Sequence, residues 1–144
     1  MKMKRIALGI TTTTFLSLGV FAGSTQTANA AAWHQGTPTI LQGKWRTKLL
    51  HEKGYPSVKG RGYIKFKPNS FFWIPALPPK DGQSGLQARY KRIAKGVYYL
   101  KGKDYNNAPA GGIVFNYKVH LYNRHKMAFK VVNSSWDNHI FYKS

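Results

Sequence analysis

The chain has very few side chains that could do acid–base chemistry. Its four carboxylates are Glu52, Asp81, Asp104 and Asp137. All four fall in predicted turns or loops, and nothing in their spacing brings two of them together. Glycoside hydrolysis needs a pair of carboxyl groups on either side of the scissile bond. The sequence therefore does not predict a cell-wall hydrolase.

The segment 134–139 holds a Ser, an Asp and a His within six residues. A catalytic triad needs these groups to converge from a scaffold, with the base between nucleophile and acid. Within a single turn, such side chains are expected to cap the turn through hydrogen bonds. The chain also has no cysteine nucleophile and no Gly-x-Ser-x-Gly motif. We therefore expect no catalytic residue and no enzyme activity.

The histidine spacing does not indicate a metal site. The five histidines are His34, His51, His120, His125 and His139. No pair has the His-x-x-x-His spacing of a helical zinc site, and no cysteine is available as a ligand. The Gly-Arg-Gly sequence at 60–62 is too short for a phosphate-binding loop and does not lead from a strand into a helix. We expect neither a metal nor a cofactor.

The charge is strongly unbalanced. Lys and Arg number 23 against four acids, so the formal net charge is +19 and the pI about 10.3. Such an excess implies a polyanionic neighbour, such as nucleic acid, anionic lipid or an acidic wall polymer. Solubility alone does not require so large an imbalance.

Period-two alternation of apolar and polar residues dominates the chain after residue 40, and it predicts an all-β fold. In the clearest strand, 113–122, five alternate apolar residues share one face. Other strands are expected at 41–50, 62–67, 71–74, 86–93, 96–101, 127–131 and 139–143. Seven or eight antiparallel strands in a meander indicate a small barrel, lipocalin-like in form, or a sandwich.

The first thirty residues have the layout of a secretory signal peptide. A basic start at 1–5 precedes an uncharged apolar run at 6–21, and small residues stand at Ala28 and Ala30. Cleavage is expected after Ala30, or after Ala32 as an alternative. The expected organisation is a signal peptide at 1–30, an N-terminal extension at 31–40 and a single β domain at 41–144. The protein would then be secreted, either extracellular or loosely associated with the cell wall, without stable membrane insertion.

Gly43 and Trp45 form a Gly-x-Trp motif at the start of the first predicted strand. This motif resembles the opening of lipocalins and related calycin barrels. The resemblance implies that Trp45 closes the base of a barrel and that Gly43 has a structural role. In those barrels an Arg from a late strand packs near the Trp. No later Arg is well placed here, because Arg124 lies in a predicted turn.

A broader resemblance follows from 33–38, 41–47 and the basic aromatic segment 63–66. These segments resemble small secreted proteins of lactobacilli, an extracellular group without assigned chemistry. The resemblance implies export from a Gram-positive bacterium and supplies no catalytic residues.

The remaining signal is a pattern of basic residues interleaved with aromatic ones, which could hold a polyanion while an aromatic ring stacks on a sugar or base. The basic candidates are Lys65, Lys67, Arg89, Lys91, Arg92, Lys118 and Lys130. The aromatic candidates, for stacking or for a pocket, are Tyr63, Trp73, Tyr98 and Tyr117. A solvated outer face that keeps an aromatic-rich barrel soluble remains the alternative interpretation.

These observations predict a monomeric, non-enzymatic protein that binds an anionic envelope polymer of the teichoic-acid type. Export argues against intracellular nucleic acid as the partner. One alternative is a calycin-type carrier with an apolar cavity lined by Phe71, Trp73, Phe115, Tyr117 and Phe129. A secreted inhibitor or antimicrobial protein is another alternative.

Overall fold

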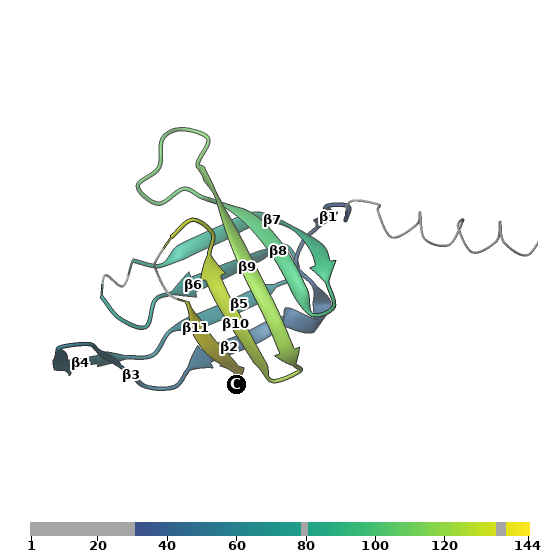
Figure 1. Ribbon diagram of the computed structural model, residues 1–144. Helices are drawn as coiled ribbons and strands as arrows, with labels where there is room; N and C mark the ends of the chain where they lie inside the picture. The colour runs from purple at the N-terminus through teal and green to yellow at the C-terminus, as the bar shows by residue number, and fades with distance from the viewer. Residues whose placement is uncertain (1–30, 79–80, 135–137) are drawn as a thin grey trace, which may run out of the picture. The chain divides into compact units, whose positions relative to one another are not determined.

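One long strand, β7 (Gln83–Ala94), closes the sheet of this protein on itself. The computed structural model describes residues 31–78, 81–134 and 138–144. The first part of β7 pairs with β6 (Ser70–Ile74), and the remainder pairs with β8 (Val97–Asp104). Eight antiparallel strands thus form a closed barrel in the order β7-β6-β5-β2-β11-β10-β9-β8 (Figure 1). The expectation of an all-β barrel is confirmed.

The other barrel strands run mostly between sequence neighbours. They are β2 (Gly43–Thr47), β5 (Tyr63–Lys67), β9 (Ile113–Asn123), β10 (Lys126–Val131) and β11 (His139–Lys143). The pair β11–β2 joins the end of the chain to the first barrel strand. Closure leaves no open sheet edge in the barrel, and open edges are what expose aromatic strands to aggregation.

Alternation along the strands fills the interior. In β5, Ile64 and Phe66 are buried while the residues on either side are exposed. In β9, Tyr117 and Val119 are fully buried, whereas Ile113 at the start of the strand is exposed. The pattern of 113–122 therefore predicts the inward face correctly only from its middle onwards. The early part of β9 extends beyond the packed interior.

Several large aromatic side chains meet in the core. The ring of Tyr117 lies 5.0 Å from that of Phe71 and 5.4 Å from that of Phe129, between ring centroids. Phe129 also lies 5.8 Å from Trp73 and 5.9 Å from Phe141. These contacts show an interior filled by side chains of the kind that small barrels usually contain.

The close approach of β7 to Phe71 and to β8 depends on two glycines, Gly85 and Gly102. A Cβ atom on Gly85 would lie 2.3 Å from ring carbons of Phe71, and one on Gly102 would lie 2.4 Å from the Cα of Gly85. The ladder between β7 and β8 shifts by one residue after Leu86, and Gln87 takes a positive φ of 50°. This is a β-bulge, which bends the strand and turns its side chains.

The segment 31–40, expected to be an extension, packs on the barrel. Strand β1 (His34–Gln35) pairs with β7, and the 3-10 helix η2 (Thr39–Leu41) follows. Leu41, placed by the sequence in the first strand, is fully buried in η2. Residues 31–144 form one compact unit.

Trp45 is fully buried, and its indole Nε1 donates a hydrogen bond of 2.7 Å to the carbonyl oxygen of Leu41. The Nζ atom of Lys143 in β11 lies 5.4 Å from the centre of the Trp45 ring. A late-strand cation does pack on this Trp, but it is a lysine. Gly43 has a φ of +122°, and a Cβ there would lie 3.3 Å from Lys143 Cε, so glycine suits this position.

Two features of the fold differ from the expectation. The predicted strand 41–50 is interrupted, and β3 (Leu50–Glu52) pairs with β4 (Tyr55–Gly60) in a separate hairpin that extends from the barrel (Figure 1). The acids are not all in loops: Glu52 ends β3, and Asp104 is the buried last residue of β8. The single turn expected to hold the Ser, Asp and His of 134–139 includes residues 135–137, which lie outside the described residues.

Candidate polyanion-binding face

The register of β1, β7, β8 and β9 aligns polar side chains across the outside of the barrel. Gln35 pairs with Arg89, Arg89 with Lys101, and Lys101 with Asn116. Directly paired residues project from the same face of an antiparallel sheet. Lys101 follows the fully buried Leu100, so this row faces outwards.

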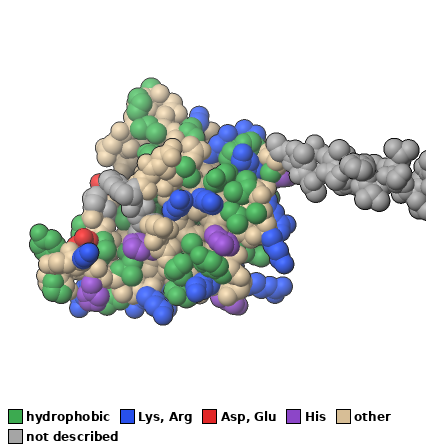
Figure 2. Space-filling view, in the orientation of Figure 1, with side chains coloured by type: hydrophobic (Ala, Val, Ile, Leu, Met, Phe, Trp, Pro, Cys, Tyr) green, Lys and Arg blue, Asp and Glu red, His purple; other side chains and the backbone are tan. Residues whose placement is uncertain are grey.

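A second row lies beside the first. Lys91 pairs with Tyr99, Tyr99 with Lys118, and Lys118 with Lys130. Together the two rows form what we term the β7–β10 basic face, whose members are Arg89, Lys91, Lys101, Lys118 and Lys130, with Trp33 and Tyr99. Figure 2 shows Lys and Arg side chains denser towards the side of β1 and β7, with the few visible acids at the opposite end.

The aromatic rings of this face lie under ammonium groups. The Nζ atoms of Lys101 and Lys91 lie 4.3 and 5.1 Å from the centre of the Trp33 ring. Those of Lys91 and Lys118 lie 5.7 and 5.9 Å from the centre of the Tyr99 ring. Cation–π attraction at these distances restrains long lysine side chains that would otherwise sample many rotamers. The rings therefore help to hold the positive charges close together.

Like charges lie directly opposite one another on this face. Lys118 is the cross-strand partner of Lys130, and Arg89 is the partner of Lys101. Such pairs are destabilising, with cross-strand pair energies of about 0.2–1 kcal/mol. A phosphate or carboxylate between the paired cations would relieve this repulsion.

Three clefts open on the β7–β10 basic face; one, of about 200 Å³, is lined by Lys118 and Lys130, and the other two lie nearer β7 and β8. The larger of these two, of about 470 Å³, is lined by Arg89, Lys101 and Lys103 together with Gln35 and Gln87. The smaller, of about 180 Å³, includes Trp33, Lys91, Tyr99 and Asn116. Among the residues that the structure describes, no acid lines either of these two clefts. Both are therefore suited to an anion.

The predicted basic residues do not form a single surface. Arg89, Lys91, Lys118 and Lys130 come together, but Lys65 and Lys67 lie on β5, across the barrel. There, Lys65 pairs with Lys44 of β2, and Tyr63 pairs with Arg46. Lys44, Arg46, Tyr63, Lys65 and Lys67 thus make a second outer basic area, the β2–β5 basic face.

Arg92 and Tyr98 also lie apart from the two rows. They pair with each other, and Tyr98 pairs with the buried Val119, so both project to the inner side of the wall. Tyr98 packs partly against the core, while Arg92 is exposed and its Nε donates to the carbonyl oxygen of Ala94 at 3.3 Å. Both line an open cleft near the β9–β10 turn, a different location from the basic face.

Trp73 and Tyr117 are both fully buried in the core, where they cannot stack on an external ligand. The hydroxyl of Tyr117 donates a hydrogen bond of 3.0 Å to Oε1 of Gln83. Burial, together with the negative charge of Asp104, raises the pKa of the Tyr117 phenol above its ordinary value. Of the four aromatic candidates, only Tyr63 has a largely exposed ring on a basic outer face.

Three members of the basic face did not emerge as candidates from the sequence: Trp33, Tyr99 and Lys101. Trp33 precedes β1 in a segment that has no alternating pattern. Tyr99 and Lys101 have the correct parity on β8, but only the cross-strand register places them next to Lys91 and Lys118. Parity in β8 was a signal that could have found Tyr99 and Lys101, whereas no pattern pointed to Trp33.

Within 31–78, 81–134 and 138–144, no group of three or more His, Cys, Asp or Glu side chains could hold a metal ion. In the same part of the chain, no helix is long and apolar enough to cross a membrane. The predicted signal peptide and the Asp of the 134–139 segment lie outside the described residues.

Comparison of the chain with protein-family models, with curated proteins and with solved structures finds no match. The two outer rows, their aromatic neighbours and their clefts are therefore the features that indicate a function.

Proposed function

We propose that this protein is a secreted, non-enzymatic protein that binds an anionic polymer of the cell envelope, of the teichoic-acid type. The observation that carries the proposal is the cross-strand row of Lys91, Tyr99, Lys118 and Lys130. Three cations from three strands face one side, with no acid in the adjoining clefts of the described structure. A linear phosphate polymer carries regularly spaced negative charges, which can contact successive cations of this row.

The energetics support a partner of this kind. Repulsion within the Lys118–Lys130 pair weakens the free protein, and a polyanion that binds the folded state offsets it. Charge-driven binding also retains a protein on an anionic surface without a covalent anchor. Such retention weakens as salt screens the contacts.

The alternative of an apolar-ligand carrier has less support. Four of its five proposed cavity residues, Phe71, Trp73, Tyr117 and Phe129, contact one another in the core. An apolar ligand would have to displace these packed rings. No feature of the described residues favours an inhibitor or antimicrobial protein over a polymer-binding protein.

The test is the salt dependence of binding to purified poly(glycerol phosphate), measured by isothermal titration calorimetry. We compare wild type with the variant Lys118→Gln/Lys130→Gln and with a control of equal charge change, Lys53→Gln/Lys59→Gln. The control residues lie in the β3–β4 hairpin.

For nucleic acids, each lost phosphate contact lowers the slope of log K against log salt by about 0.7–0.9. We expect the Lys118/Lys130 variant to lose a slope of about 1.5 on that scale, and the hairpin control to retain the wild-type slope. Equal losses of slope in both variants would show that binding depends on net charge alone and not on the β7–β10 basic face. Absence of binding at low salt would overturn it.

A further inference from the structure

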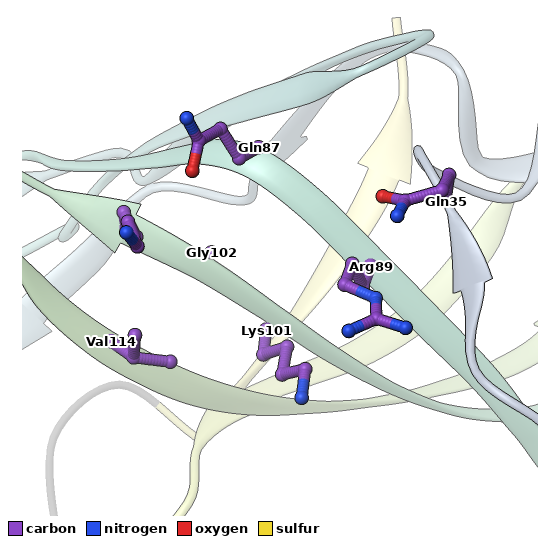
Figure 3. Close-up of a pocket in the computed structure, with 7 residues that line it drawn as sticks. Gln35, Gln87, Arg89, Lys101, Gly102 and Val114 are labelled. Carbon is purple, nitrogen blue, oxygen red and sulfur yellow. The ribbon is translucent and has the colours of Figure 1, made fainter.

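The largest cleft of the β7–β10 basic face has the composition of a phosphate site. We refer to it as the Arg89 pocket; its polar lining consists of Arg89, Lys101, Lys103, Gln35 and Gln87. Figure 3 shows these elements meeting, with Gln35 on β1 beside Arg89 on β7 and Lys101 on the neighbouring β8. Three cations and two amides surround a volume of about 470 Å³, and no acid lines it among the described residues.

Arg89 has an unmet hydrogen-bonding requirement. Its side chain is half-buried, and the Nε atom is buried with no hydrogen-bond partner within the described part of the protein. A buried donor without a partner carries a desolvation cost. Arg89 lines the pocket, and a guanidinium can meet a phosphate with two parallel N–H donors.

The backbone of β7 has an irregular conformation beside the Arg89 pocket. The bulge lies between Leu86 and Arg89, and Gln87, with its positive φ, is two residues before Arg89. A positive φ at a residue other than glycine is uncommon, and strained residues of this kind cluster at binding sites. Gln87 lines the same pocket as Arg89 and Lys101.

The neighbouring rings favour a polyol phosphate over a nucleic acid. Proteins that bind single-stranded nucleic acid offer aromatic faces on which bases stack. Here Trp33 and Tyr99 each lie under two ammonium groups of this same chain. The rings position cations, and a ligand without bases loses nothing by this arrangement.

We infer that the Arg89 pocket binds one phosphate group of a polyol-phosphate chain, with Arg89 and Lys101 as the charged contacts. Gln35 and Gln87 donate from the rim, and Trp33 is a positioning residue that holds Lys101. That the polyol-phosphate ligand is an envelope polymer rests on the proposed function. The affinity of the pocket for a phosphate group does not depend on the proposed function.

The first experiment titrates the full exported chain with inorganic phosphate and with sn-glycerol 3-phosphate at constant ionic strength, followed by ¹H–¹⁵N NMR. We expect saturable shifts centred on Gln35, Gln87, Arg89 and Lys101. Non-saturating shifts spread over all lysines would overturn the pocket.

Variants separate a built site from general charge. Arg89→Lys keeps the charge but loses the paired donors, and Arg89→Gln loses both. A charge-assisted hydrogen bond is worth about tenfold in affinity or more, so we expect both variants to bind phosphate at least about tenfold more weakly. Lys53→Gln should bind as wild type. Wild-type affinity in Arg89→Lys would contradict the inference, and thermal melts of each variant show whether it remains folded.

The last arm distinguishes failure of the pocket from failure of the proposed function. Poly(glycerol phosphate) and a deoxythymidine oligonucleotide of equal charge are compared on wild type and Arg89→Gln. Polymer binding that is unchanged in Arg89→Gln would reject the pocket and leave the proposed function standing. Binding of phosphate without binding of the polymer would support the pocket and reject the proposed function. Tighter binding of the oligonucleotide than of the polyol polymer would reject the inferred ligand class.

Discussion

Lys130 of β10 lies directly opposite Lys118 of β9 on the outside of the barrel. Like charges directly opposite on neighbouring strands reduce stability, with a cross-strand effect of about 0.2–1 kcal/mol. The protein nevertheless places Tyr99 and Lys91 next in the same row, which keeps a third cation nearby. This local instability is what a polyanion would reverse.

Replacing Lys130 with glutamate should stabilise the free protein and weaken polymer binding. An opposite-charge pair replaces a like-charge pair, so we expect the free energy of unfolding to rise by about 0.5–1 kcal/mol at low salt. Urea denaturation measures this change. Lys53→Glu changes the net charge equally without a cross-strand cation opposite it, and should stabilise less. If Lys130→Glu were less stable than wild type, repulsion between Lys118 and Lys130 would not destabilise the protein.

Lys143 should stabilise the barrel through Trp45. Its Nζ atom lies 5.4 Å from the Trp45 ring centre, and it also donates to the carbonyl oxygen of Ile40 at 3.4 Å. We expect Lys143→Ala to cost about 1 kcal/mol, and Lys143→Arg to restore most of that stability. Equilibrium unfolding monitored by Trp fluorescence is suitable. Equal stability of the alanine and arginine variants would show that the cation contributes nothing.

Strand β7 should not tolerate a side chain at Gly85. A Cβ atom there would overlap the ring of Phe71, so Gly85→Ala should destabilise by about 1–3 kcal/mol. In a Phe71→Leu background the same substitution should cost less, because the ring is absent. A double-mutant cycle measures the difference. Additive effects would indicate that the contact with Phe71 is not the cause.

Tyr117 should make the protein sensitive to alkaline pH. Its folded-state pKa is raised, so its contribution is complete below the ordinary tyrosine value of about 10 and declines as pH rises above it. The unfolded chain then loses a proton that the folded chain keeps. Tyr117→Phe should cost about 1 kcal/mol at neutral pH through loss of the hydrogen bond to Gln83.

Stability measured between pH 9 and 11 tests this linkage. Wild type should lose stability more steeply than Tyr117→Phe, because the other tyrosines and lysines titrate in both proteins. Parallel curves for the two proteins would contradict the assignment to Tyr117.

The barrel was predictable where one side of a strand is buried. In β5 and β10 the apolar residues alternate, and every second side chain is buried in the structure. In β4 no such alternation exists, because five of its six residues are not buried. The β3–β4 hairpin could therefore not be predicted from the sequence. Asp104 looked like a loop residue because a buried acid at a strand end has no local signature.

The functional face was only partly predictable. Alternation shows that Lys91, Lys118 and Lys130 point outwards, but their proximity depends on pairing between strands that lie far apart in the sequence. Trp73 and Tyr117 were candidates for stacking or for a pocket, and both prove to be core residues, so the stacking role is wrong for them. The bulge at Gln87, which orients Arg89, follows from the closure of the whole barrel.

The most direct test of the central claim is a map of backbone amide shifts when poly(glycerol phosphate) is added to the ¹⁵N-labelled protein. We expect the largest shifts on the β7–β10 basic face, at Arg89, Lys91, Lys101, Lys118 and Lys130. The β2–β5 basic face, with Lys65 and Lys67, carries similar charge on the other side of the barrel and serves as an internal control. Shifts centred on Lys65 and Lys67, or spread evenly over both faces, would contradict the account.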